Sequence, residues 1–384
     1  MIYFDNSATT KPYKEVLESF LKVSSDFFGN PSSLHGLGGQ AEKLLAQARK
    51  QISTLMNTKP GEVIFTSGGT ESNNLAIKGI ALMYRGRGHH LITTEIEHPS
   101  VLASMRQLEG LGFEVTYLPV DSNGRVRLSE VKESLREETI LVSIMHVNNE
   151  VGSIQPIEEI GELLCCYPKT LFHVDHVQGV GKVPLDLDTC KIDLMSISGH
   201  KFHGVKGTGA LLIREGVSLS PLFSGGDQER RQRSGTENVP GIVAMAKALR
   251  LEMENRDRHF QKLINIQKVL RSSLSEIEGI TVHTPDTFFA PHILNFSIAG
   301  IRAEVFVHAL EEREIYVSTT SACSSKRRMP SKTLLAMGIS PENAESSIRI
   351  SLSYDNTEDE AQKALAAIEE TVRKLGRKKS KHEL

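Results

Sequence analysis

The chain has 384 residues and a formal net charge of −2, with 45 Lys and Arg against 47 Asp and Glu. This balance gives no electrostatic reason for direct nucleic-acid binding, and the sequence contains no apolar run of about 18 residues that would predict a membrane span. The length predicts two domains, because a single core stops growing near about 250–300 residues. The four cysteines form no CxxC pair, which predicts reduced thiols and no metal site. The first residues lack a basic segment followed by an apolar one, so no secretory signal is predicted and the expected location is the cytoplasm.

Strand and helix patterns alternate through the first two thirds of the chain. Apolar residues recur at helical spacing over residues 39–57, and a short apolar run predicts a strand over 62–66. Further strands are predicted over 90–94, 113–118, 140–146, 172–175, 194–198 and 210–213. This alternation predicts an α/β fold whose mostly parallel sheet is covered by helices on both faces.

The last third has a different pattern. Residues 239–274 contain almost no Gly or Pro and predict one long helix. Beyond it, strands are predicted over 281–283, 293–297 and 347–351, and helices over 303–312 and 357–375. We interpret this part as a smaller α+β domain that follows a helical connector.

A Gly-Gly turn follows the strand predicted over 62–66. The segment Ser67-Gly-Gly-Thr-Glu-Ser72 opens a helix, and free N–H groups at a helix start attract an anion such as phosphate. A plain strand-to-helix turn would have much the same sequence.

A carboxylate ends the strand predicted over 172–175. Ligands of open parallel sheets bind at the carboxyl ends of strands, so Asp175 could hold a protonated ring nitrogen or a metal. His173 and His176 flank Asp175, and two core or rim histidines are the simpler interpretation of this pair.

A lysine follows the strand predicted over 194–198, in the segment Ser198-Gly-His-Lys201. Burial lowers the pKa of a lysine, and the neutral amine can form a Schiff base with an aldehyde. The alternative is a surface residue of a hairpin, and Lys206 lies only five residues further on.

One cysteine lies in a segment rich in small hydroxyl residues. Cys323 matches no helix or strand pattern, and the basic run Lys326-Arg-Arg328 should favour its reactive thiolate. An incidental exposed thiol is the alternative. Cys165 and Cys166 are predicted to pack in a helix over 157–166, and Cys190 is predicted to be inert.

Ten motifs occur in order between residue 5 and about residue 355. They are Asp5-Asn-Ser-Ala-Thr-Thr10, Asn30-Pro-Ser-Ser-Leu-His35, Thr66-Ser-Gly-Gly-Thr-Glu-Ser72, Glu97-His-Pro-Ser100, Val147-Asn-Asn-Glu-Val-Gly152, Val174-Asp-His-Val-Gln178, Ser198-Gly-His-Lys201, Arg233-Ser-Gly-Thr236, Ser321-Ala-Cys323 and Ser347-Ile-Arg-Ile350. Together they closely resemble the cysteine desulfurases of the NifS/IscS type. The resemblance implies a fold-type I pyridoxal phosphate (PLP) enzyme that works as a homodimer. It also implies a large cofactor domain over residues 12–255 and a small domain, residues 1–11 and 256–384, that carries the catalytic cysteine loop.

The resemblance assigns roles residue by residue. Lys201 matches the lysine that holds PLP as a Schiff base, and Asp175 matches the carboxylate that pairs with the pyridinium nitrogen. His98 resembles the histidine that stacks on the ring and serves in catalysis, and Gln178 resembles the residue that bonds the ring hydroxyl. The phosphate is expected on Gly69, Thr70, Ser198 and His200, with Thr236 reaching in from the other subunit.

The same resemblance predicts the substrate and the reaction. Asn149 and Arg349 match the residues that hold the substrate carboxylate, and Cys323 matches the nucleophile. The expected reaction converts L-cysteine to L-alanine and leaves a persulfide on Cys323, which passes to an acceptor protein. The acceptor is expected to be a tRNA 2-thiouridine synthase or an iron–sulfur scaffold, and a thiamine-pathway carrier is also compatible with the sequence. A basic end at 377–381, unlike the usual scaffold-docking tail, favours the tRNA pathway.

Three departures from the family pattern and two alternatives accompany this interpretation. His176 replaces a small residue, Thr319-Thr320 replaces Ser-Gly, and Gly69 replaces the commoner alanine. One alternative is a class V aminotransferase or lyase that acts on another amino acid. Such an enzyme would not need Cys323, so the detection of a persulfide would distinguish the two. The other alternative is a catalytically silent sulfur carrier with the same fold.

Overall fold

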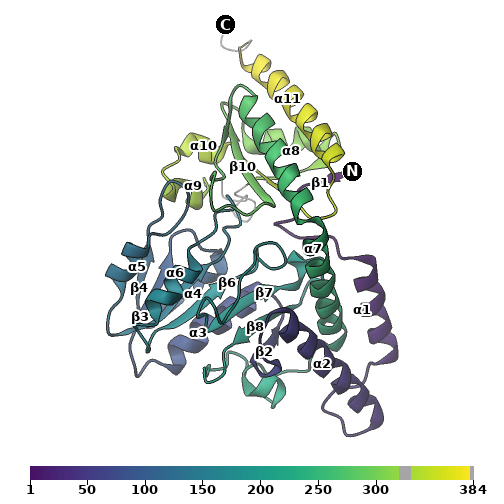
Figure 1. The fold of residues 1–384 in the computed structure, drawn as a ribbon, viewed down its shortest axis with the longest axis vertical. Coiled ribbons are helices and arrows are strands. Elements are labelled where there is room, and N and C mark those ends of the chain that lie inside the picture. Colours follow the sequence, from purple (N-terminus) through teal and green to yellow (C-terminus); the bar gives the residue numbers. More distant parts are fainter. Residues whose placement is uncertain (320–329, 381–384) are drawn as a thin grey trace.

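A seven-stranded sheet forms the centre of the larger body (Figure 1). The computed structural model describes residues 1–319 and 330–380. The strand order is β2-β8-β7-β6-β5-β3-β4, and β8 alone runs opposite to its neighbours. The strands are β2 (Val63–Thr66), β3 (His90–Thr94), β4 (Glu114–Leu118), β5 (Thr139–Met145), β6 (Leu171–Asp175), β7 (Leu194–Ser198) and β8 (Gly209–Ile213). The predicted α/β class with a mostly parallel sheet is confirmed.

Helices cover both faces of this sheet because its strands carry apolar side chains on both sides. In β2, Val63 and Phe65 pack on one face and Ile64 on the other. One face is covered by α2 (Gly36–Leu55), α6 (Ile157–Leu164) and the first part of α7 (Val239–Glu276). The other face is covered by α3 (Gly69–Met83) and α4 (Pro99–Glu109).

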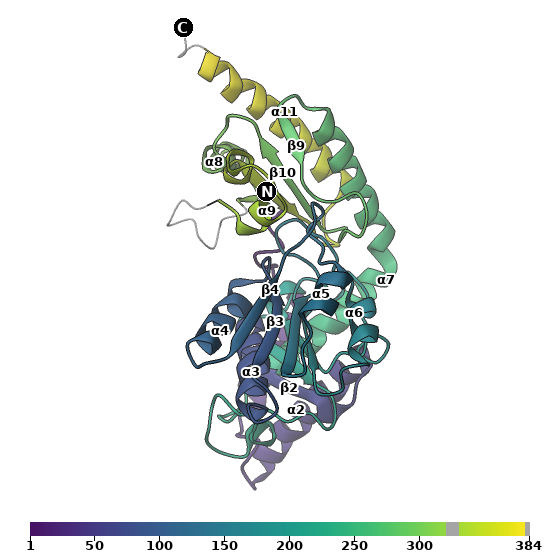
Figure 2. The same ribbon diagram turned by 90° about the vertical axis from the view of Figure 1, so that its left-hand side faces the viewer.

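A second, smaller sheet has the strand order β12-β13-β10-β9. Its strands are β9 (Ile280–Val282), β10 (Ile293–Ile298), β12 (Ser318–Thr319) and β13 (Ser347–Ser351), and α8 (Ala303–Glu311) and α11 (Glu358–Ser380) pack against it. The 38-residue helix α7 runs along the flank of both bodies (Figures 1 and 2). Leu249 lies in the core of the larger body and Leu263 in that of the smaller one. The predicted boundary at 255/256 therefore falls inside one continuous helix and stays a prediction.

The N-terminus belongs to the smaller body before it crosses to the larger one. Strand β1 (Ile2–Tyr3) pairs with β11 (Ile315–Tyr316), and Phe4 is fully buried in the smaller core. Residues 5–10 then run beside the loop that carries Lys201, where the Thr10 N–H donates to the His200 carbonyl. The N-terminal segment thus reaches the edge of the large sheet.

Some elements and one packing prediction differ from the sequence analysis. The helices absent from it are α1 (Lys14–Asp26), α5 (Leu128–Ser134), α9 (Lys332–Ala336) and α10 (Pro341–Glu345). In α1 the exposed Leu17 and Leu21 obscure the helical spacing of the buried Val16 and Val23. The prediction that Cys165 and Cys166 pack is wrong, since α6 ends at Leu164 and both thiols are exposed.

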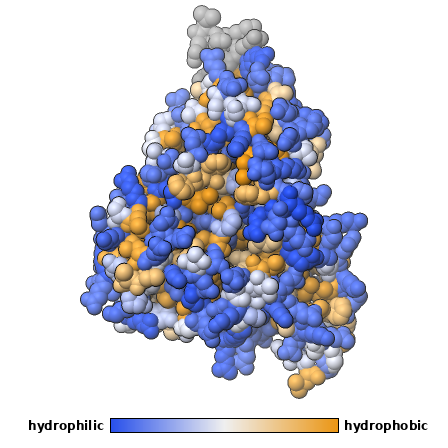
Figure 3. All heavy atoms as spheres, viewed as in Figure 1, coloured by the Kyte–Doolittle hydropathy of each residue, from blue (hydrophilic) through white to orange (hydrophobic). Residues whose placement is uncertain are grey.

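Apolar side chains gather on the surface at the tip where α1 and α2 meet, at the lower right of Figure 3. This tip patch comprises the exposed residues Leu21, Phe28, Leu34 and Leu37, and Phe28 keeps 70% of its surface accessible. Within the described part of the chain, no helix combines the length and apolarity that a bilayer crossing requires.

Candidate active site

The carboxyl ends of β2, β6 and β7 converge on one small region of the sheet edge. A Cβ added at Gly69, the first residue of α3, would lie 2.8 Å from Val177 Cγ2 and 3.5 Å from Ser198 Cβ. The Gly-Gly turn, the segment after Asp175 and the end of β7 are therefore in contact. Glycine allows this approach without a shift of Val177, and the turn lies at the N-terminus of α3, where an anionic ligand is favoured.

Asp175 is held by two hydrogen bonds at the end of β6. Its Oδ2 accepts from Asn73 Nδ2 at 2.7 Å, and its Oδ1 accepts from the Val177 N–H at 3.0 Å. Asp175 keeps 7% of its surface accessible and Asn73 only 1%. The carboxylate is thus fixed in position and mostly shielded from water.

His98 lies beside this carboxylate at the start of α4. Its Nδ1 is 2.8 Å from Ser100 Oγ and also accepts from the Ser100 N–H at 3.2 Å. Burial lowers the pKa of His98; the charge of Asp175 acts in the opposite direction, and the charge of Lys201 lowers the pKa further. The pKa of His98 therefore depends on the charges of Asp175 and Lys201, the two groups that the sequence predicts to bind the cofactor.

Lys201 ends the short turn η2 (Gly199–Lys201), directly after β7. Its Nζ donates to the carbonyls of Ser7 and Ala8, the latter at 3.0 Å. Gln178 Nε2 donates to the same Ser7 carbonyl at 3.1 Å. Lys201 and Gln178 are therefore both hydrogen-bonded to the N-terminal segment.

His200 precedes Lys201 in the same turn. Its Nδ1 lies 3.2 Å from Thr9 Oγ1. Burial, together with the charges of Lys201 and Lys206, lowers the pKa of His200 to about 4. His200 is thus neutral at physiological pH and available for hydrogen bonding.

Arg349 comes to the site from β13 in the smaller body. Its guanidinium donates to Asp5 Oδ1 and to the Asn149 carbonyl, both at 2.9 Å. Only 6% of the side chain is exposed, and its Nε is buried without a hydrogen-bond partner among the described residues. A buried guanidinium with spare donor capacity suits a carboxylate ligand.

Thr236 is not joined to this cluster within the described part of the chain. It is exposed, and its segment is linked to the site by the ion pair of Arg233 with Glu71, at 2.8 Å. Cys323 lies outside the described residues.

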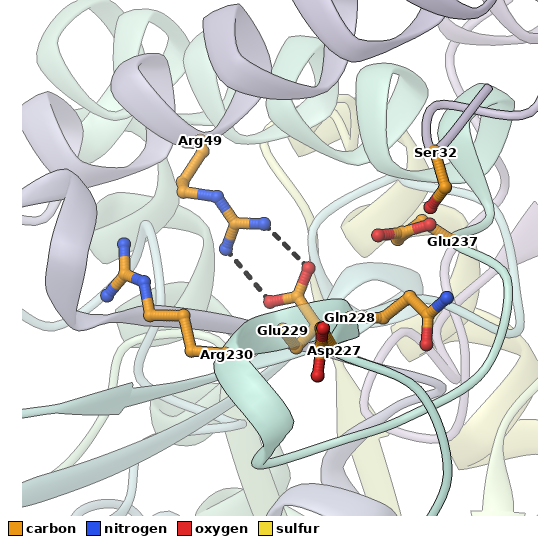
Figure 4. Close-up of a pocket in the computed structure, with 7 residues that line it drawn as sticks. All are labelled: Ser32, Arg49, Asp227, Gln228, Glu229, Arg230 and Glu237. Carbon is orange, nitrogen blue, oxygen red and sulfur yellow. Dashed lines mark hydrogen bonds and ion pairs between the residues drawn. The ribbon is translucent and has the colours of Figure 1, made fainter. Parts of the chain in front are cut away.

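A separate hollow of about 460 Å³ lies next to the Thr236 segment (Figure 4). It is lined by Ser32, Arg49, Asp227, Gln228, Glu229, Arg230 and Glu237. Glu229 and the next two residues all adopt positive φ, which is unusual for residues other than glycine. The nearly buried Glu229 secures this turn by pairing with Arg49 at 2.6 Å and by accepting from the Phe65 N–H at 2.9 Å. The hollow contains none of the predicted cofactor residues.

Three buried residues of the site had no role predicted from the sequence. Asn73 bonds Asp175, Ser100 bonds His98, and Glu97 accepts from the Met145 N–H at 2.9 Å. Burial raises the pKa of Glu97 to about 8, and the charge of Asp175 contributes to the increase. Glu97 and Ser100 belong to the Glu97-His-Pro-Ser100 motif, and Asn73 lies among the polar residues at the start of α3, directly after the Thr66–Ser72 motif.

The fold and this arrangement define a class of protein: an α/β enzyme with a lysine, a carboxylate and the N-terminus of a helix at one sheet edge. The family model for class-V aminotransferases matches residues 2–364, and the chain belongs to that family. Within it, the chain is a PLP-dependent cysteine desulfurase of the NifS/IscS type.

Individual relatives align over nearly the whole chain. A NifS/IcsS protein homolog of Lactobacillus delbrueckii subsp. bulgaricus is 50% identical over 96% of this chain and 97% of its own length. The cysteine desulfurase IscS of Methanosarcina thermophila is 44% identical over 97% of this chain and 92% of its own. A solved NifS-like protein superposes with a TM-score of 0.91, at 40% identity, over 97% of this chain and 99% of the other.

The residues at the site fit PLP. Ser198 Oγ is buried without a hydrogen-bond partner among the described residues, beside the open turn at Gly68 and Gly69. Such an unpaired hydroxyl at a helix start is suited to a phosphate oxygen. A carboxylate fixed as Asp175 is suits a pyridinium nitrogen, and the Lys201 amine is of the kind that forms a Schiff base with the aldehyde.

Proposed function

We propose that this site holds PLP through the residues that the resemblance assigned. Lys201 binds the aldehyde, Asp175 faces the ring nitrogen, His98 stacks on the ring, and Gln178 bonds the ring hydroxyl. The phosphate is held by Gly69, Thr70, Ser198 and His200, and by Thr236 of the partner subunit. The contacts of Gly69 with Val177 and Ser198 support this assignment, because they bring three separate motifs together.

The chain's own residues orient the substrate and move its protons. When bound, PLP withdraws electrons from the amino-acid carbon toward the ring nitrogen that Asp175 faces. Arg349 and Asn149 bind the carboxylate of L-cysteine, and the Lys201 amine removes the proton from Cα. The buried Arg349 supports this role, because its Nε has no partner in the described structure.

We infer that Cys323 receives the sulfur. Its thiolate attacks the sulfur of the substrate, so that one S–S bond forms and the Cβ–S bond breaks. The electron pair of that bond remains on carbon, which takes up a proton and leaves as L-alanine. The enzyme keeps the sulfur as a persulfide on Cys323.

The observation that carries this proposal is the pairing of β12 with β13, in which Ser318 stands opposite Arg349. The chain that leads to Cys323 therefore passes the arginine assigned to the substrate. Cys323 follows Thr319 by four residues, a reach of at most about 14 Å from the end of β12. The segment that leads to the proposed nucleophile therefore starts beside the arginine assigned to the substrate carboxylate.

The experiment that tests the function is a sulfur map of the holoenzyme after one exposure to L-cysteine. We expect intact-protein mass spectrometry to show the mass of one added sulfur atom, and peptide mapping to place it on Cys323. Cys165 and Cys166 are exposed and serve as internal controls. Sulfur on those cysteines instead, or release of alanine without a persulfide, would contradict the assignment.

We propose a homodimer whose interface covers the tip patch and the Thr236 segment. Phe28 and Leu34 are large apolar residues of that patch that are exposed in the single chain, and exposed apolar residues that gather in one place are typical of an interface. The Arg49–Glu229 pair fixes the turn that precedes Thr236, and Thr236 itself is exposed on the surface of the single chain.

Replacing Phe28 and Leu34 together by aspartate is expected to shift the protein to monomers in sedimentation velocity. Buried charges oppose association, whereas the replaced residues are exposed within one chain. The matched control is Leu111→Asp, which changes an exposed leucine outside the patch. A double variant that remains dimeric would exclude the tip patch from the interface.

The persulfide is proposed to pass to an acceptor in tRNA thiolation or in iron–sulfur cluster assembly. The basic run at 377–381 supports an acceptor other than the usual scaffold. A cytoplasmic location remains a prediction from the use of cysteine.

A further inference from the structure

Four polar residues form one chain of hydrogen bonds from the cofactor carboxylate to the stacking histidine. Asn73 Nδ2 donates both to Asp175 Oδ2 at 2.7 Å and to Ser100 Oγ at 2.9 Å. Ser100 Oγ lies 2.8 Å from His98 Nδ1. All three bonds are shielded, because Asn73, Ser100 and Asp175 each keep less than a tenth of their surface accessible.

The ionised carboxylate determines the direction of every bond in this chain. An amide oxygen turned toward Asp175 would place two acceptors against each other, so Asn73 must present its NH₂ group. One amide hydrogen goes to Asp175 and the other to Ser100 Oγ. The Ser100 hydroxyl then accepts from Asn73 and donates its own hydrogen to His98 Nδ1.

His98 Nδ1 consequently receives two donors, because the Ser100 N–H also points at it at 3.2 Å. A protonated Nδ1 could still donate to the second lone pair of Ser100 Oγ, but it would face the Ser100 backbone N–H with a hydrogen of its own and would lose that bond. A neutral imidazole carries one hydrogen, which must therefore be on Nε2. Nε2 makes no hydrogen bond to any residue in 1–319 or 330–380, which leaves it available to a ligand.

We infer that Asn73 and Ser100 are positioning residues that fix His98 as the neutral Nε2–H tautomer. In this form His98 donates a hydrogen bond to the bound cofactor or substrate and does not act as a general base. The tautomer follows from the geometry alone, whereas its use in the reaction rests on the proposed function. His98 then acts as a neutral hydrogen-bond donor through Nε2.

The charges around His98 are consistent with this form. Asp175 on β6 favours the protonated ring, Lys201 on η2 opposes it, and burial lowers the pKa of His98 overall. Hydrogen bonds to the neutral form of a group also disfavour its charged form. Loss of the Ser100 hydroxyl should therefore raise the pKa of His98.

The test is magic-angle-spinning NMR of the holoenzyme labelled with ¹⁵N at histidine Nδ1 only. The signal of His98 is identified among the 14 histidines by its absence in His98→Gln. In the wild type we expect an unprotonated Nδ1. Its pKa should rise by about one unit in Ser100→Ala, the shift that loss of one hydrogen bond produces.

Ser100→Thr is the matched control, because it keeps a hydroxyl and should retain the wild-type pKa. The inference is overturned by a protonated Nδ1 in the wild type, or by a His98 pKa that is the same in Ser100→Ala and the wild type. Persulfide formation on Cys323 is measured separately. A missing persulfide with the expected Nδ1 signal would contradict the proposed function and leave the tautomer standing.

Discussion

Replacing Cys323 by alanine is expected to leave the protein yellow with bound PLP and to lower sulfur release from L-cysteine by roughly 10⁴-fold or more, the scale of removing a nucleophile. The other site residues are unchanged, so the cofactor should stay bound. Alanine has no sulfur that could accept the substrate's sulfur, and no S–S bond can form. The measurement combines the absorbance of the cofactor with the rates of alanine and persulfide formation.

The control for this variant is the double replacement of Cys165 and Cys166 by alanine. Both thiols are exposed at the end of α6 and are reachable by reagents. We expect that double variant to react at the wild-type rate. If Cys323→Ala released sulfur normally while the double variant did not, the nucleophile would have to be reassigned to Cys165 or Cys166, which follow α6.

The large sheet could be predicted because its strands are buried on both faces. Such strands are continuous apolar runs, and the predicted segment 194–198 coincides with β7. The α1 helix was absent from the prediction, since Leu17 and Leu21 are exposed in the single chain and blur its apolar face. When a helix has apolar residues that pack against nothing in the same chain, the spacing of its apolar residues does not identify it as a helix.

The site residues in motifs could be identified through the resemblance, but their partners could not. Asn73 bonds an aspartate 102 positions away, and Lys201 bonds the Ser7 carbonyl 194 positions away. No local sequence pattern predicts contacts between residues so far apart. They form because α3, β6, β7 and the N-terminal segment meet at the sheet edge. Local sequence therefore indicated the reactive groups, and the fold revealed what orients them.

Replacing Lys201 by alanine is expected to remove the absorbance of the lysine-linked cofactor and to lower desulfuration by at least about 10²–10⁴-fold. That range is the usual contribution of one general acid–base group. The variant also loses the hydrogen bonds from Nζ to the Ser7 and Ala8 carbonyls, so residues 5–10 should become easier to cleave by protease. The paired measurements are absorbance spectra and turnover of L-cysteine.

Lys206→Ala is the matched control for this variant, because Lys206 is exposed and lies in the same loop. It should retain the colour and the turnover of the wild type. Its charge contributes to the lowered pKa of His200, so its removal should raise that pKa slightly without affecting the amine at position 201. If Lys206→Ala lost the lysine-linked absorbance and Lys201→Ala kept it, the aldehyde would be bound five residues further along the chain. Asp175 and the Gly69 turn would then no longer belong to the cofactor site.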